Sequence, residues 1–278
     1  MAQTPEQIEA ALGELAAAGT SCVVLNGGDG TAQAALTTLS LRSPFASPPT
    51  LLVLAGGTTN MSAYDLGSHS RPARLLQRLL AGRLAVTRRR MLCVREADGT
   101  TRCGFFFTAG GLPQAVRDCR AFRETSTLPG MRSALGTAAW ISGRLLRLLA
   151  GREPFEALAL NYRPDAEPVR RCEALLLLAS THERLALGLT PWWCAGGGPI
   201  RATLISRPAR RLARALPGLL RGRPPAFANA AAGYESRAIT TLHLTPTGGY
   251  ALDGEDYFPP AGSELVVDAG PEFEFLRP

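Results

Sequence analysis

Lysine is absent from this sequence, and all 30 basic residues are arginines. A P-loop nucleotide site and a protein kinase site both depend on a lysine that contacts phosphate groups, so both classes are excluded. Any phosphate site in this chain has to be made from backbone amides, hydroxyl groups and arginine.

Cysteine pairs, histidine clusters and long apolar runs are also missing. The six cysteines are scattered without a C-x-x-C pair, which predicts reduced thiols, no disulfide framework and no metal site. The three histidines have no spaced partners. The start of the chain has no signal-peptide pattern, and Arg144 and Arg147 interrupt its most apolar helix. We expect a cytoplasmic protein, which could contact the inner face of the membrane peripherally. We expect no nucleic-acid partner, because no recognition motif is present.

The segment Asn26–Thr31, with the sequence NGGDGT, is the most informative part of the chain. It follows the apolar run Cys22–Leu25, which predicts a strand, and precedes Ala32–Leu36, which predicts a helix. Glycines let a backbone approach a phosphate closely, and the free N–H groups of a helix N-terminus attract anions. Asp29 would repel a bare phosphate, which indicates a cation or a metal–nucleotide complex. A turn without any ligand is the alternative.

Two further motifs follow the same logic. Leu51–Leu54 is a second apolar run that leads into the glycine turn of residues 55–61, and neighbouring parallel strands bring such turns into one crevice. Near the other end, DGE at residues 253–255 follows the alternating pattern of residues 240–244. Two carboxylates that flank a glycine can supply a general base and a metal or network partner. A plain hairpin turn is the alternative interpretation.

The three motifs in this order, GGDGT, GGTTN and DGE, resemble those of the diacylglycerol-kinase-type lipid kinases, which include soluble bacterial enzymes and the sphingosine and ceramide kinases. The resemblance covers most of the chain. Phe105–Leu112 is similar to the glycine segment that opens the family's second domain, and Ala195–Gly198 to a later glycine run. GGDGT by itself is less specific, because NAD kinases share it.

The chain departs from the family pattern in three places. Only 26 residues precede Gly27, where the family usually has a further strand that ends in an Asn-Pro turn. Met61 stands where the family often has an aspartate, and Pro199 follows the later glycine run where an Asp-Gly pair is usual. The first departure removes part of the expected nucleotide cradle, and the other two remove carboxylates from the expected Mg²⁺ network.

The resemblance implies an ATP-dependent lipid kinase that uses Mg²⁺ and phosphorylates the hydroxyl of a diacylglycerol-like lipid alcohol at a membrane surface. Asp253 is the expected general base and Glu255 its metal or hydrogen-bond partner, although the two roles could be exchanged. No direct metal ligand is assigned. The residues expected to bind the nucleotide lie in the first two motifs: Asn26, Gly27, Gly28, Asp29, Gly30, Thr31, Gly57, Thr58 and Asn60.

Two domains are expected in these 278 residues. Residues 1–83 with 259–278 should form a shortened α/β nucleotide-binding domain with a parallel sheet, as in NAD kinases and diacylglycerol kinases. Residues 84–258 should form a β-rich, sandwich-like domain for the lipid substrate. The expected elements of the chain after residue 70 are strands at 84–95, 101–108, 154–162, 171–180 and 185–189 and helices at 71–82, 113–123 and 131–150.

A basic helix is expected at Pro208–Arg221, where arginines alternate with leucines. Such a helix could hold the protein on an anionic membrane, and an ordinary surface helix is the alternative. Two functional alternatives also stay open. One is a lipid- or nucleotide-binding homologue with impaired chemistry, and the other is an NAD-kinase-like enzyme, although the chain has no Thr-x-x-Gly-Ser segment of that family's kind.

Overall fold

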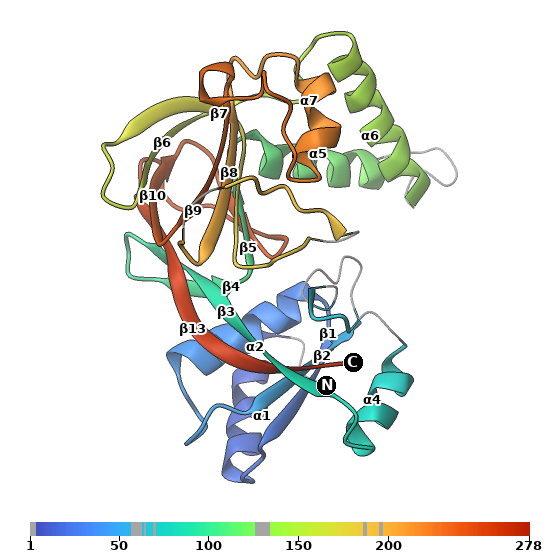
Figure 1. The fold of residues 1–278 in the computed structure, drawn as a ribbon. Helices are drawn as coiled ribbons and strands as arrows, with labels where there is room; N and C mark the ends of the chain where they lie inside the picture. The colour runs from blue at the N-terminus through green and yellow to red at the C-terminus, as the bar shows by residue number, and fades with distance from the viewer. Residues whose placement is uncertain are drawn as a thin grey trace.

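The fold is that of a computed structural model, which describes residues 4–56, 63, 65–68, 71–125, 134–185, 188–194 and 197–278. Figure 1 shows α1, α2 and α4 around β1 and β2 at one end of the molecule, and α5, α6 and α7 gathered at the other end beside the β-rich part. In the part of the chain described, no helix is long and apolar enough to cross a membrane.

The N-terminal part alternates helices and strands, and its start is set by local chemistry. Thr4 and Gln7 form a capping box, and Pro5 occupies the first helical position, where a missing N–H costs nothing. β1 and β2 pair in parallel, with Cys22 opposite Thr50. The elements of this part are α1 (Pro5–Ala17), β1 (Cys22–Gly27), α2 (Asp29–Leu41), β2 (Thr50–Ala55) and α4 (Pro72–Leu80).

The remaining chain is dominated by antiparallel strands. Its helices are α5 (Gly111–Thr125), α6 (Ala134–Leu149) and α7 (Leu212–Leu219), with a short 3₁₀ turn at Ala230–Ala232. Its strands are β3 (Ala85–Glu96), β4 (Thr101–Gly104), β5 (Phe106–Ala109), β6 (Leu158–Pro164), β7 (Arg170–Ser180), β8 (Ile200–Ser206), β9 (Tyr234–Ile239), β10 (Thr241–Pro246), β11 (Tyr250–Leu252), β12 (Glu255–Tyr257) and β13 (Leu265–Arg277).

The long C-terminal strand β13 joins the two parts. Its first half pairs with β10 and β3, and its second half continues along β3 and meets β2 in parallel at Phe275. The register shifts between Ala269 and Glu272, where Pro271 has no amide hydrogen to donate. Leu265 therefore lies in the core of the β-rich part, whereas Phe275 lies in the core around β1, β2 and α2. The predicted fold class, a parallel α/β part followed by a β-rich part, is confirmed. The predicted domain boundaries stay a prediction.

Several local predictions are corrected. The helix expected at Pro208–Arg221 is limited to α7. Ala209 and Arg211 have left-handed backbone conformations, which are incompatible with a right-handed helix, so the helix begins only at Leu212. The single strand expected at 101–108 is two strands separated at Phe105. The strand expected at 185–189 is wrong for Leu185, Gly188 and Leu189, which lie in a turn, and its other residues are outside the described part.

The expectation that every cysteine is a free thiol is also wrong. Cys93 of β3 and Cys103 of β4 lie opposite each other in the antiparallel register and form a disulfide. The other four cysteines are free thiols. The disulfide closes the hairpin around Asp98 and Gly99, a turn whose residues are typical of such connections.

Candidate active site

The first glycine turn forms the start of α2. β1 ends at Gly27, and Gly28 is the N-cap of α2 without a capping side chain from the described residues. A side chain at Gly27 would bring its Cβ within 2.5 Å of Thr31 Oγ1, so only glycine fits there. The first-turn amides and the helix dipole make this end of α2 suited to an anion.

The second glycine turn begins beside the first. Gly56 follows β2, and its amide donates a hydrogen bond to the carbonyl oxygen of Gly27 at 3.0 Å. A Cβ at Gly56 would lie 3.0 Å from Gly27 N and 3.1 Å from Asn26 Oδ1, so Gly56 allows the two turns to touch. The other nucleotide-binding residues predicted in this turn, Gly57, Thr58 and Asn60, lie outside the described residues.

The DGE motif forms the tight turn between β11 and β12. Asp253 and Gly254 both have positive φ angles, 49° and 89°, which is the backbone conformation of a two-residue hairpin turn. The turn carries Glu255 to the start of α2, where a Cβ at Gly30 would lie 2.7 Å from Glu255 Oε1. The structure thus brings the first and third motifs, which lie at opposite ends of the chain, into contact.

The carboxylate of Asp253 is held by backbone amides at the start of β5. Its Oδ1 accepts hydrogen bonds from Phe105 N at 3.1 Å and Phe106 N at 2.8 Å, while its Oδ2 accepts only the shared bond from Phe105 N at 3.1 Å. Burial raises the pKa of Asp253 to about 7, and the nearby charge of Asp29 adds to the increase, although the amides and His182 lower it. A carboxylate with a pKa near neutrality is suited to accept a proton at neutral pH.

A buried charged cluster lies on the other side of Phe105, and sequence reasoning missed it. The side chain of Asp65 is 2% exposed and that of His182 is 1% exposed. Asp65 Oδ2 accepts a hydrogen bond from Arg89 Nε at 2.8 Å and lies 3.3 Å from His182 Nδ1, an ion-pair distance without hydrogen-bond alignment. Burial alone would raise the pKa of Asp65, but His182 and Arg89 together hold it well below its usual range.

This cluster contacts the support of Asp253. The ring of His182 stacks on Phe105 with centroids 4.8 Å apart, and Phe105 N is a hydrogen-bond donor to Asp253. No spacing pattern in the sequence marks His182, because its partners come from distant segments of the chain. A cavity of about 470 Å³ opens beside the cluster, and its lining includes Asp65, Arg89 and Arg184.

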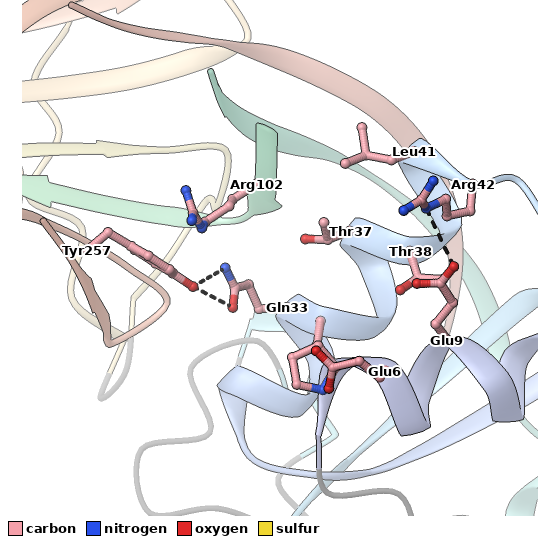
Figure 2. Close-up of a pocket in the computed structure, with 11 residues that line it drawn as sticks. Glu6, Glu9, Gln33, Thr37, Thr38, Leu41, Arg42, Arg102 and Tyr257 are labelled. Carbon is pink, nitrogen blue, oxygen red and sulfur yellow. Dashed lines mark hydrogen bonds and ion pairs between the residues drawn. The ribbon is translucent and has the colours of Figure 1, made fainter. Parts of the chain in front are cut away.

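A polar recess adjoins the contact between α2 and β12 (Figure 2). Gln33 lies one helical turn after Gly30, and its Nε2 donates a hydrogen bond to Tyr257 Oη at 2.9 Å. The guanidinium of Arg102 lies over the Tyr257 ring, 4.4 Å from its centroid. The recess has a volume of about 270 Å³ and extends from this bond along α2 toward α1. It can therefore receive polar groups from a ligand seated at the start of α2.

Comparisons with known proteins agree with the motifs. Residues 1–88 match the family model of the diacylglycerol kinase catalytic domain. A diacylglycerol kinase structure from Bacillus anthracis str. Sterne has a TM-score of 0.61 at 13% identity and aligns with 100% of this chain and 83% of its own. A putative diacylglycerol kinase from the same strain has a TM-score of 0.63 at 16% identity, with 100% and 84% covered. No protein of curated function matches the sequence.

At these identities the two structures establish the fold alone, and the match to the family model is limited to the first 88 residues. The resemblance to the diacylglycerol kinase family is therefore confirmed: residues 1–88 match its catalytic domain, and the whole chain shares the fold of two diacylglycerol kinase structures.

Proposed function

We propose that this protein is an ATP-dependent lipid kinase, located in the cytoplasm, that transfers the γ-phosphate to the hydroxyl of a diacylglycerol-like lipid alcohol. The observation that carries the proposal is the contact of Glu255, which lies in the same tight turn as Asp253, with Gly30 near the start of α2. A glycine turn that can hold phosphates lies against a turn that bears two carboxylates. Phosphoryl transfer to an alcohol needs these two components side by side.

In this proposal the phosphates of ATP lie over the amides of Gly28–Thr31 at the N-terminus of α2. The acceptor hydroxyl attacks the γ-phosphorus, its proton passes to Asp253, and the bond from the γ-phosphorus to the bridging oxygen breaks to leave ADP. Oδ2 is the proton acceptor, because Oδ1 already accepts two amide hydrogen bonds. Glu255, beside Gly30, would be the metal or hydrogen-bond partner of this base.

The residues fit a magnesium ion that arrives with the nucleotide. Within the described ranges no group of three or more histidine, cysteine or carboxylate side chains could hold a metal ion by itself. Mg²⁺ keeps several of its waters and commonly binds through substrate phosphates and one or two carboxylates. Asp29, the first residue of α2, would hold the ion through water. When bound, the ion neutralises phosphate charge during transfer.

The proposal is tested by measuring transfer of labelled γ-phosphate from Mg·ATP to lipid alcohols in mixed micelles. We expect a labelled lipid with the wild-type protein, and a rate reduced roughly 10²–10⁴-fold for Asp253→Asn, because the general base is lost. Asp98→Asn, a change in the exposed β3–β4 turn, is the matched control and should retain full activity. Equal rates for Asp253→Asn and wild type would rule out Asp253 as the base.

A second candidate function is a binding protein of the same fold with impaired chemistry. Both oxygens of Asp253 are engaged by backbone amides, and Met61 replaces an aspartate of the family pattern. ATP binding by calorimetry, together with no labelled product for any lipid alcohol, would favour this candidate over the kinase.

A further inference from the structure

One end of the β-rich part carries an apolar and basic surface, which we call the α6–α7 surface. Its apolar members are three leucines of α6 that lie in solvent: Leu145 is 47% exposed, Leu146 67% and Leu149 66%. Its basic members are exposed arginines at the end of α6, in the turn before α7 and in α7: Arg147, Arg152, Arg210, Arg211 and Arg214. Large apolar side chains that are exposed together usually mark a contact surface.

The two helices form a single groove. Leu149 and Arg152 line one side of it and Arg211 and Arg214 line the other, around a volume of about 340 Å³. Figure 1 shows α6 and α7 side by side at the end of the molecule that is remote from α1. Leu149 therefore lies beside the arginines of the groove, and Leu145 and Leu146 continue its apolar surface one helical turn earlier on α6.

The arginines of this face keep their charge unneutralised. Among the described residues, Arg152, Arg210 and Arg214 form no ion pair with a carboxylate. Glu153 is the only carboxylate in the described lining of the groove, and it is paired with Arg207 at 2.7 Å. The surface is thus apolar and net positive, and a complementary partner must be both apolar and net negative.

We propose that the α6–α7 surface docks on an anionic lipid bilayer. The leucines would enter the interface between headgroups and acyl chains, and the arginines would contact lipid phosphates. A nucleic acid would satisfy the arginines but leave the leucines in water. This surface would be the face on which the kinase approaches its lipid acceptor, an inference that rests on the proposed function. The docking itself can be measured without turnover.

The test is co-sedimentation of the full chain with vesicles of phosphatidylcholine alone or of phosphatidylcholine and phosphatidylglycerol in equal parts. We expect binding to the mixed vesicles only, and release by high salt. The double variant Arg152→Gln with Arg214→Gln should bind the mixed vesicles roughly 30-fold more weakly, as expected for two lost arginine contacts. Leu146→Ser and Leu149→Ser should each weaken binding roughly tenfold.

The matched control is Arg74→Gln with Arg78→Gln in α4, because α4 also combines exposed arginines with exposed leucines, at the other end of the molecule. This control should bind like wild type. Circular dichroism and thermal unfolding establish that each variant is folded. Unchanged binding by the α6–α7 variants, or release by the α4 variants alone, would overturn the proposal. Vesicle binding without lipid phosphorylation would contradict the kinase and leave the docking surface supported.

Discussion

The glycine turn before α2 and the buried cluster of Asp65, Arg89 and His182 are assembled in opposite ways. The turn consists of consecutive residues, and its chemistry lies in the backbone and the helix N-terminus. The cluster collects side chains from three separate segments and depends on the ion pair of Asp65 and Arg89, with His182 packed beside it. A site built by one short segment can be recognised in a sequence, whereas a site built by distant charges becomes visible only in the folded chain.

The largest effect should come from removing the charge at the centre of the cluster. Asp65→Ala leaves the buried guanidinium of Arg89 without the carboxylate that neutralises it and removes the group that faces His182, and breaking a buried ion pair costs about 3–5 kcal/mol. We expect a fall of this size in the free energy of unfolding, measured by urea denaturation. The control Asp98→Ala, in an exposed turn, should change stability by less than about 0.5 kcal/mol. A loss below about 1 kcal/mol for Asp65→Ala would show that the cluster is not a stabilising unit.

The next effect concerns the pH dependence of stability at Asp253. Its folded-state pKa is raised to about 7, so between that pH and the unfolded pKa of about 3.9 the folded chain holds a proton that the unfolded chain has released. The stability that this proton contributes is complete below pH ~4 and is lost as the pH rises through ~7.

Denaturation of wild type and Asp253→Asn across this range measures the effect. The stability of wild type relative to the variant should fall by about 2–4 kcal/mol as the pH rises. A difference that does not change with pH would contradict the raised pKa of Asp253. The same variant also tests catalysis. The two measurements together separate the effect of the buried carboxylate on stability from its effect on the rate of phosphate transfer.

A smaller and more selective effect is expected from two glycine substitutions in helices. Gly30→Ala places a methyl group against Glu255 Oε1, and Gly13→Ala in α1 places one in open space. Alanine favours a helix over glycine by about 1 kcal/mol, so Gly13→Ala should stabilise the protein by roughly that amount. We expect Gly30→Ala to reduce phosphate transfer roughly tenfold or more without a matching loss of stability, because it displaces Glu255. Full activity would mean that the contact between the motifs is not needed.

The smallest effect should come from the helix cap of α1. Thr4→Ala removes the side chain that accepts the hydrogen bond from Gln7 N at 3.3 Å. Loss of such a cap costs about 1 kcal/mol, and thermal unfolding should show it. Phosphate transfer should be unchanged, because Thr4 is the N-cap of α1 and does not line the recess beside α2. A loss of activity would show that α1 contributes to the site.

The sequence predicted those parts of the molecule whose conformation is determined by residues close together in the chain. The order of elements through β2, the glycine turn before α2 and the tight Asp253-Gly254 turn follow from apolar runs and from glycines at positions with special backbone geometry. The contact between Glu255 and Gly30 was indicated only by the resemblance to a family, because no local rule pairs residues so far apart.

The predictions that were wrong concern features that depend on strand register and backbone conformation in the folded chain. The Cys93–Cys103 disulfide depends on the exact register of β3 and β4, which the positions of the cysteines alone do not reveal. The shortened helix α7 depends on the left-handed conformations of Ala209 and Arg211, residues that normally avoid them. Phe105 breaks the expected long strand at the point where its amide is used to hold Asp253.

The most direct test of the central claim is a competition between acceptors. The protein is incubated with Mg·ATP labelled at the γ-phosphate in the presence of both diacylglycerol micelles and NAD, and the products are separated. We expect label in the lipid and none in the dinucleotide. Label in NAD would contradict the proposal that the acceptor is a lipid. The absence of any labelled product from a protein that binds ATP would contradict the proposal that it is a kinase.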